Sequence, residues 1–440
     1  MARTALLAAA LPLLLALAGT ASAAPGGGSS GFGGGGGGGG GGFSGGGGAS
    51  GTGSGGGGWV VLVVFGVFAV IILLGLIQAR RLRKRRRERV RRVELAAAEA
   101  VADDEHFAVD AVREQAAELL RSIMVAWTAR DRRALGAKLG PDLMVEWERR
   151  LDDFDRKRWH NVCELLSGPE VEYVGLLNRD DDVDDRVVVR VTSVLRDYVL
   201  DADGNKITRT GTSAETVTLS EYWTLGRRDG EWALLSIEQD AEGAHHLDAP
   251  IVASPWSDEE LLRDEAVAEL AAADAVPDAA VAGIADLDFD GDARAAALDL
   301  SNVDGRFAPH VLEAAARRAV YAWAEAVDGD DAALEALAGP EAVEALLYPG
   351  DPGRRTRIVV RGPRLIALRI TGLDAASQPP AMTVEADVSG RRYVEDRATA
   401  AVRAGSKERE VTFTERWTMA LDGEGPMPWR IAVAAAPARS

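Results

Sequence analysis

The stretch Val187-Val188-Val189-Arg190-Val191-Thr192-Ser193-Val194-Leu195-Arg196 is the clearest sign of the fold in this chain of 440 residues. Its apolar side chains alternate with Arg190, Thr192 and Arg196, which is the period of a half-buried β-strand. Asp201-Ala202-Asp203-Gly204 follows as a hairpin connection. Val217, Leu219, Trp223 and Leu225 then supply the inward face of another strand. An antiparallel sheet is therefore predicted for this region.

Helices are predicted before these strands. An apolar stripe at helical spacing ends at Trp127 and comprises Val109, Val112, Ala116, Leu119, Leu120, Ile123 and Trp127. A second helical region includes Trp147 and Leu151, and the pattern changes to period two after Gly168-Pro169. Helices followed by a run of strands indicate an α+β fold, with the helices on one face of a curved sheet.

The same landmarks occur twice in the same order. The pairs are Ala126-Trp127 with Ala322-Trp323, Gly140-Pro141 with Gly339-Pro340, Glu221-Tyr222-Trp223-Thr224 with Glu415-Arg416-Trp417-Thr418, and Trp232 with Trp429. Matching landmarks in one order indicate two copies of one domain. We place the copies at 106–244 and 306–440. An acidic linker at 245–305 separates them, and Ser257 with Glu260 predicts a helix in it through about Ala275.

These motifs resemble those of bacterial membrane proteins with the mitochondrial import inner membrane translocase subunit 44-like domain. The resemblance is good over copy 1 and weaker over copy 2, where Arg416 stands in place of Tyr222. It implies two tandem cone-like domains of the nuclear transport factor 2-like type, each with an apolar pocket between helices and sheet. It also implies a tethering role at a membrane. The chaperone-binding segment of the mitochondrial member has no counterpart that we identify, so import activity does not follow.

The amino-terminal residues predict a membrane setting. Residues 1–23 have the apolar run and small-residue end of a signal peptide, and 24–58 form a glycine-rich segment that cannot bury a core. Residues 59–78 are long and apolar enough for one transmembrane helix, and 79–105 form a polybasic juxtamembrane segment. The Lys/Arg bias predicts a single-pass protein of the bacterial plasma membrane, with the N-terminus outside and both domains in the cytoplasm.

Charge divides the chain into a basic anchor and an acidic body. Residues 93–440 contain 39 basic and 67 acidic residues, a net charge of −28, which disfavours nucleic acid as a partner. The basic side chains expected to bind anionic lipid head groups are Arg80, Arg81, Arg83, Lys84, Arg85, Arg86, Arg87 and Arg89. Alternatively, this block acts only as a topology signal. The one cysteine, Cys163, is expected in helical surroundings as a small core residue.

Two carboxylates fall on apolar strand faces and are candidates for polar groups in the pockets. Glu221 lies between Leu219 and Trp223, and Glu415 repeats this arrangement. The pocket candidates together are Trp127, Glu221, Trp223, Trp323, Glu415 and Trp417. The alternative, which we favour, makes the tryptophans core residues and the carboxylates structural ion pairs or helix-end contacts.

Metal and catalytic motifs are weak. Asp286, Asp288 and Asp290 begin like a calcium loop, but its twelfth position is Ala297 rather than glutamate. His245-His246 shows no companion ligands at useful spacing. We therefore predict no catalytic residues, no cofactor and no metal.

The leading prediction is a non-enzymatic scaffold that binds a protein partner or lipid, linked to protein translocation. The alternative is a small-molecule-binding protein or isomerase-like enzyme that takes a small apolar ligand into the cone pocket, by analogy of fold.

Overall fold

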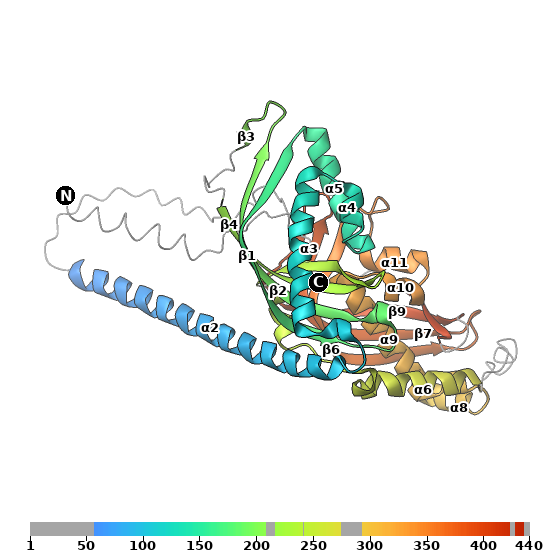
Figure 1. The fold of residues 1–440 in the computed structure, drawn as a ribbon. Coiled ribbons are helices and arrows are strands. Elements are labelled where there is room, and N and C mark those ends of the chain that lie inside the picture. The colour runs from blue at the N-terminus through green and yellow to red at the C-terminus, as the bar shows by residue number, and fades with distance from the viewer. Residues whose placement is uncertain (1–56, 208–215, 241, 274–292, 423–426, 435–440) are drawn as a thin grey trace, which may run out of the picture.

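The computed structural model describes residues 57–207, 216–240, 242–273, 293–422 and 427–434, and it contains two α+β halves (Figure 1). Each half has helices first and an antiparallel five-stranded sheet afterwards. The α+β class predicted from the sequence is confirmed. The signal peptide, the glycine-rich segment up to residue 56 and Asp286, Asp288 and Asp290 lie outside the described residues.

The first half comprises residues 57–247. Its helices are α2 (Gly57–Ala100), α3 (Val109–Ala129), α4 (Arg132–Gly136) and α5 (Pro141–Lys157), with the 3-10 turns η1 (Glu105–Phe107), η2 (Asp182–Asp184) and η3 (Gly243–Leu247). Its strands are β1 (His160–Leu177), β2 (Arg186–Leu200), β3 (Lys206–Ile207), β4 (Thr216–Arg228) and β5 (Glu231–Gln239).

The second half comprises residues 293–434. Its helices are α8 (Ala293–Ser301), α9 (Pro309–Asp328), α10 (Ala332–Leu337) and α11 (Pro340–Leu347), with η5 (Gly305–Phe307) between the first two. Its strands are β6 (Thr356–Asp374), β7 (Ala381–Asp396), β8 (Val402–Gly405), β9 (Val411–Leu421) and β10 (Trp429–Ala434). Between the halves lie η4 (Pro255–Ser257) and α6 (Glu259–Ala273).

The two sheets have the same topology. The strand order is β1-β2-β4-β5 in the first sheet, with β3 paired to β2, and β6-β7-β9-β10 in the second, with β8 paired to β7. The register places Glu221 of β4 opposite Val191 of β2, and Glu415 of β9 opposite Ala386 of β7. The two carboxylates therefore occupy equivalent positions on the two sheets.

Aromatic contacts at the end of each core repeat as well. In the first half Phe107 meets Trp232 edge-on at 5.6 Å, and the indole Nε1 of Trp232 donates to the carbonyl of His106 at 3.2 Å. In the second half Phe307 meets Trp429 at 5.7 Å, and that indole donates to the carbonyl of Arg306 at 3.0 Å. In each half this contact joins the 3-10 turn, η1 or η5, to the last strand, β5 or β10. The two cores are therefore packed in the same way at this end.

Local sequence explains where the helices begin and end. Asp131 caps α4 by accepting a hydrogen bond from the amide of Ala134 at 2.9 Å. Pro141 is the first residue of α5, a position where its missing N–H leaves no hydrogen bond unmade. Arg158 ends α5 in the left-handed conformation with a φ of 54°, which turns the chain into the sheet.

Two details differ from the prediction. Strand β1 begins at His160, before Gly168-Pro169. Bulges at Leu165–Ser167 and Ser167–Glu170 interrupt its alternating pattern, so the sequence does not reveal the first part of the strand. Cys163 is consequently a buried strand residue rather than a helical one, and its thiol contacts Asn161 at 3.2 Å. A capping box joins Ser254 and Ser257 at η4, and α6 ends at Ala273, close to the predicted end. The side chain of Glu260, the predicted partner of Ser257, lies outside those that the structure describes.

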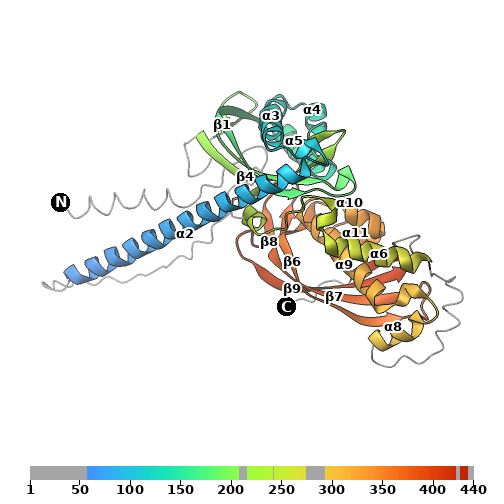
Figure 2. The same ribbon diagram turned by 60° about the horizontal axis from the view of Figure 1, so that its bottom comes forward.

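Each core also uses a helix that precedes the predicted copy. Val93, Ala97 and Ala100 at the end of α2 are fully buried in the first core. Ala297 and Leu300 of α8 are buried in the second core. The amino-terminal part of α2 extends away from both halves as a long arm (Figure 2). The predicted juxtamembrane and linker segments are thus partly structural elements of the two halves.

Candidate functional site

Tryptophan side chains fill the interior of the first half. Trp127 packs edge-on against Trp147 with ring centroids 5.0 Å apart, and both are buried in the first core. The Nε1 of Trp127 donates to Oδ1 of Asn161 at 2.6 Å, so its polar atom is satisfied inside the protein. Trp223 is fully buried in the same core. These residues are core residues rather than the walls of an open ligand cage.

The second half is filled in the same manner. Trp323 and Trp417 lie 5.7 Å apart, and Phe413 packs against Trp323 at 6.3 Å. Both tryptophans belong to the second core. The predicted cone pocket is therefore occupied by the protein's own side chains in both halves at these positions.

Glu221 is enclosed within this packing and has an indole as its partner. The carboxyl group is 4% exposed, and its Oε2 accepts a hydrogen bond from Nε1 of Trp223 at 3.0 Å. Burial raises the pKa of Glu221 to about 8, and the nearby carboxylates of Glu242 and Asp240 add to the increase. The group is consequently neutral at pH 7, which reconciles it with an apolar strand face.

Glu415 has a different partner from its counterpart. Its Oε1 lies 3.1 Å from Nη2 of Arg392, so this carboxylate forms the structural ion pair that we favoured from the sequence. Burial raises the pKa of Glu415, and Arg392 opposes that increase. The two equivalent carboxylates are therefore stabilised by different means.

The basic residues of α2 fall into two groups. Arg80, Arg81, Arg83, Lys84 and Arg87 are exposed along the arm. Arg85 forms an ion pair with Asp248 at 2.7 Å, and Arg86 forms one with Glu172 at 3.0 Å. These two contacts attach the arm to the first half.

Arg89 does not lie on the surface as predicted. Its guanidinium is buried and donates to the carbonyls of Val174 at 2.7 Å, Ala249 at 2.7 Å and Pro250 at 3.3 Å. Burial lowers the pKa of Arg89 to about 10. The predicted contact of Arg89 with head groups is wrong, because the helix turns this side chain toward the body rather than the solvent.

The predicted membrane span at 59–78 lies within α2, and most of its side chains are outside those that the structure describes. Over the side chains that are described, no helix is both long and apolar enough to cross a membrane.

The two halves meet along a buried polar seam between α5, β2, β5 and η3 of the first half and α9, the connection 329–331, β6 and β7 of the second. Asp142 of α5 accepts from the amide of Asp331 at 3.3 Å, and Glu242 accepts from the hydroxyl of Tyr393 at 3.0 Å. Arg186 forms an ion pair with Asp330 at 2.6 Å. Since each contact needs both halves, the seam fixes their relative orientation.

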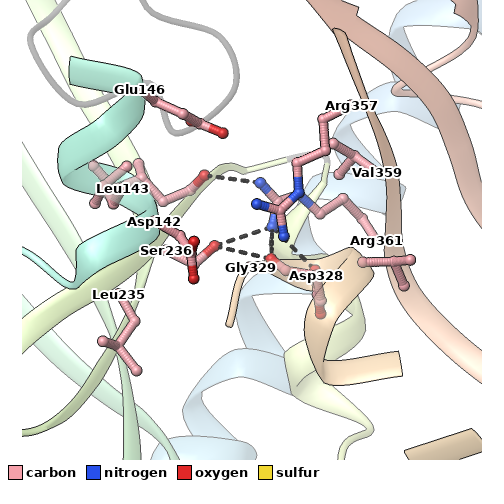
Figure 3. Close-up of a pocket in the computed structure, with 12 residues that line it drawn as sticks. Asp142, Leu143, Glu146, Leu235, Ser236, Asp328, Gly329, Arg357, Val359 and Arg361 are labelled. Atoms are coloured by element: carbon pink, nitrogen blue, oxygen red, sulfur yellow. Dashed lines mark hydrogen bonds and ion pairs between the residues drawn. The ribbon is translucent and has the colours of Figure 1, made fainter. Parts of the chain in front are cut away.

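A small cavity opens in this seam (Figure 3). Its volume is about 30 Å³, enough for one or two water molecules. Arg361 points into it from β6, donating to Oγ of Ser236 at 3.0 Å and pairing with Oδ1 of Asp328 at 3.0 Å. Arg357 lies beside it and is ion-paired with Asp331. The buried guanidinium groups are thus compensated by carboxylates and are held in fixed positions.

The structure also corrects our interpretation of His245-His246. Both imidazoles contact the carboxylate of Glu238, which strand β5 brings to them. The sequence prediction missed this companion because Glu238 lies on a strand and the histidines lie in the turn after it. The separation of seven and eight residues could have suggested the contact only if that turn had been predicted.

Comparisons with known proteins identify one part of the chain. Residues 93–239 match the family described as the Tim44-like domain. No curated protein matches the chain. The crystal structure of the intermembrane space region of the chloroplast protein ARC6 is similar at 12% identity, over 29% of this chain and 94% of that one, with a TM-score of 0.23.

Proposed function

Because residues 93–239 of this chain form a Tim44-like domain, we propose that the protein is a non-enzymatic binding module tethered to the bacterial plasma membrane. In this proposal the chain crosses the membrane once, and its two halves face the cytoplasm. There they hold a protein partner, in connection with protein translocation, while the basic arm binds anionic lipid.

The continuity of α2 is the observation that carries this proposal. One helix runs from Gly57 to Ala100, and its last turns are buried in the first core. At 1.5 Å per residue, the helix between Gln78 and Val90 spans about 18 Å. The buried guanidinium of Arg89, with its bonds to backbone carbonyls, fixes this part of α2 against the body, and the ion pairs of Arg85 and Arg86 lie beside it. A membrane-embedded start of α2 would therefore hold the body at a short, fixed distance from the bilayer.

Charge supports the same arrangement. The exposed basic turns of α2 would be attracted to an anionic leaflet, while the body, with its net charge of −28, would be repelled. The basic turns lie between the apolar start of α2 and the turns that are buried in the first core, so the two effects act at neighbouring positions along one helix. The surfaces of the two halves would consequently stay accessible to a partner in solution.

The alternative of a ligand-binding or catalytic cone pocket gains no observation in its favour. Trp127, Trp223, Trp323 and Trp417 occupy the cone interiors. Two cavities among the described residues, one in the seam and one beside Trp429, have volumes of about 30 and about 10 Å³, the size of one or two water molecules.

Tethering is tested by carbonate extraction of membranes from cells that produce the full chain. The double variant Phe68→Arg with Leu73→Arg introduces two charges into the apolar stretch, each costing about 2.5–3.5 kcal/mol at a bilayer centre. We expect the wild type to stay with the membrane and the variant to be released. The control exchanges the same positions conservatively, Phe68→Leu with Leu73→Phe, and should behave as wild type. Release of the wild-type chain by carbonate would refute the tether.

The orientation and the partner need separate measurements. A reporter fused after Ser440 should be active only in the cytoplasm, and exterior activity would refute the orientation. Trp256 is 77% exposed, and exposed tryptophans are common anchors in protein interfaces. A photoreactive amino acid at Trp256 should give a specific protein cross-link in native membranes, which excess non-reactive chain abolishes. Cross-links to lipid alone would refute a protein partner at this site.

A further inference from the structure

The cluster of Glu238, His245 and His246 lies at the seam between the halves. The Nε2 of His245 is 2.8 Å from Oε2 of Glu238, and the Nε2 of His246 is 2.8 Å from Oε1 of the same carboxylate. Ligand atoms of the three side chains all lie within 4.8 Å of one another. Two imidazole nitrogens and one carboxylate oxygen therefore converge on one small volume.

The turn that presents the histidines is held by close packing. A Cβ built on Gly243 would lie 2.4 Å from Cδ2 of Tyr222, so only glycine fits at this position. The ring of Tyr222 stacks on His246 with centroids 5.7 Å apart. Glu242 of the same turn accepts from Tyr393 in the second half. The positions of the imidazoles are thus set by the fold before any ligand arrives.

The two imidazoles are hydrogen-bonding partners of the Glu238 side chain, and the guanidinium of Arg361 also acts on it electrostatically. Asp328 is ion-paired with Arg361 at 3.0 Å, and Glu242 is 3.9 Å from the ammonium group of Lys407. Glu238 itself is 1% exposed and its two oxygens face the imidazoles. A buried carboxylate needs a cation or several hydrogen bonds, and neutral imidazole nitrogens that face it need either protons or a metal ion.

We propose that Glu238, His245 and His246 form a zinc-binding site. Two histidines and one glutamate are a known donor set for Zn²⁺, with water in the fourth position. With ligand distances of about 2.0–2.1 Å, tetrahedral coordination separates nitrogen and oxygen by roughly 3.3 Å. The observed 2.8 Å contacts run to the two different oxygens of Glu238. They would have to open by about 0.5 Å, while the three ligand atoms, which lie within 4.8 Å of one another, draw together around the ion. The side chain of His245 is 18% exposed, which gives the ion a route into the site.

A zinc ion at this position would affect how the two halves pack together. A Cβ built on Gly362 of β6 would lie 2.6 Å from Cβ of His245, so the second half packs directly on this turn. A zinc ion would join β5 to η3 beneath β6 and thereby stabilise the seam. This inference is independent of the membrane proposal, because none of its residues belongs to α2.

Zinc binding is measured on the full chain without an affinity tag. The protein is stripped with a chelator and titrated with ZnCl₂ by calorimetry, and bound zinc is counted by elemental analysis. We expect one zinc ion per chain and a rise in melting temperature on binding. His246→Gln and Glu238→Gln should each weaken binding by about 100-fold or more. The matched control is His160→Gln, a histidine of β1 whose Nε2 lies 2.9 Å from the carbonyl of Thr128, away from the cluster, and it should bind as wild type.

A spectroscopic measurement keeps the test decisive if a variant fails to fold. Cobalt bound to the wild-type chain should show the intense visible bands of a four-coordinate ion, and zinc should displace it. X-ray absorption at the zinc edge should show two imidazole ligands. Absence of stoichiometric zinc in the wild type would overturn the proposal, as would unchanged affinity in a folded His246→Gln variant.

Discussion

Replacing Glu221 with glutamine should stabilise the first half, and the gain should grow as the pH rises. The ordinary pKa of 4.5 is raised to about 8 in the folded chain, chiefly because the carboxyl is buried. Folding therefore requires the group to bind a proton at neutral pH. A raised carboxyl pKa gives stability that is present in full below pH 4.5 and is lost as the pH rises through 8.

The size of the effect follows from the linkage between proton binding and folding. Stability falls by up to about 1.4 kcal/mol for each pH unit over this range, so the whole loss is about 5 kcal/mol. Of this, about 3 kcal/mol has been lost by pH 7 and less than about 1 kcal/mol by pH 5. Glutamine cannot ionise, and its amide oxygen still accepts the hydrogen bond from Trp223. The free energy of unfolding of the variant should therefore exceed that of the wild type by about 3 kcal/mol at pH 7 and by less than about 1 kcal/mol at pH 5.

Urea unfolding of the full chain, followed by tryptophan fluorescence between pH 5 and pH 8, measures this difference. The matched control is Glu164→Gln, the same change at an exposed position of β1 where the partner is Arg196 at 2.7 Å. An exposed pair contributes about 0–1 kcal/mol, so the control should differ little from wild type at any pH. A Glu221→Gln effect that is equal at pH 5 and pH 8 would refute the reasoning.

Three further predictions concern the contacts that define the fold. Arg89→Met removes charge-assisted hydrogen bonds to backbone carbonyls, so it should lower the free energy of attachment of α2 to the body by about 1.5–3 kcal/mol. Amide hydrogen exchange over 80–100 should then accelerate, and unchanged exchange would count against this role of Arg89. Gly243→Ala should destabilise the chain by about 1–3 kcal/mol through its clash with Tyr222, and a melting temperature equal to wild type would contradict that packing. Trp232→Phe and Trp429→Phe each remove one indole hydrogen bond. Each should lower the free energy of unfolding by about 1 kcal/mol, in addition to the effect of the smaller buried ring, and very different costs would argue against equivalent roles in the two halves.

Local sequence determined the elements of this protein and their order. The alternation in 187–196 predicts β2, and the stripe ending at Trp127 predicts α3, because periods of 2 and 3.6 residues reflect how side chains leave a strand or a helix. The repeated landmarks predict that the helices and strands recur in the same sequence order, and the two sheets have the same topology. The favoured core role of the four candidate tryptophans also followed from residue type alone.

Only the tertiary structure decided which polar groups meet. No local pattern distinguishes Arg89 from the exposed arginines before it, because its partners are backbone carbonyls 85 and 160 residues away. The same holds for Glu238, which reaches His245 and His246 through a turn that the sequence does not signal. The periodicity of a sequence indicates which side chains of one helix or strand are buried. The pairing of charges depends instead on how elements from both halves pack together, and that packing is determined by the whole chain.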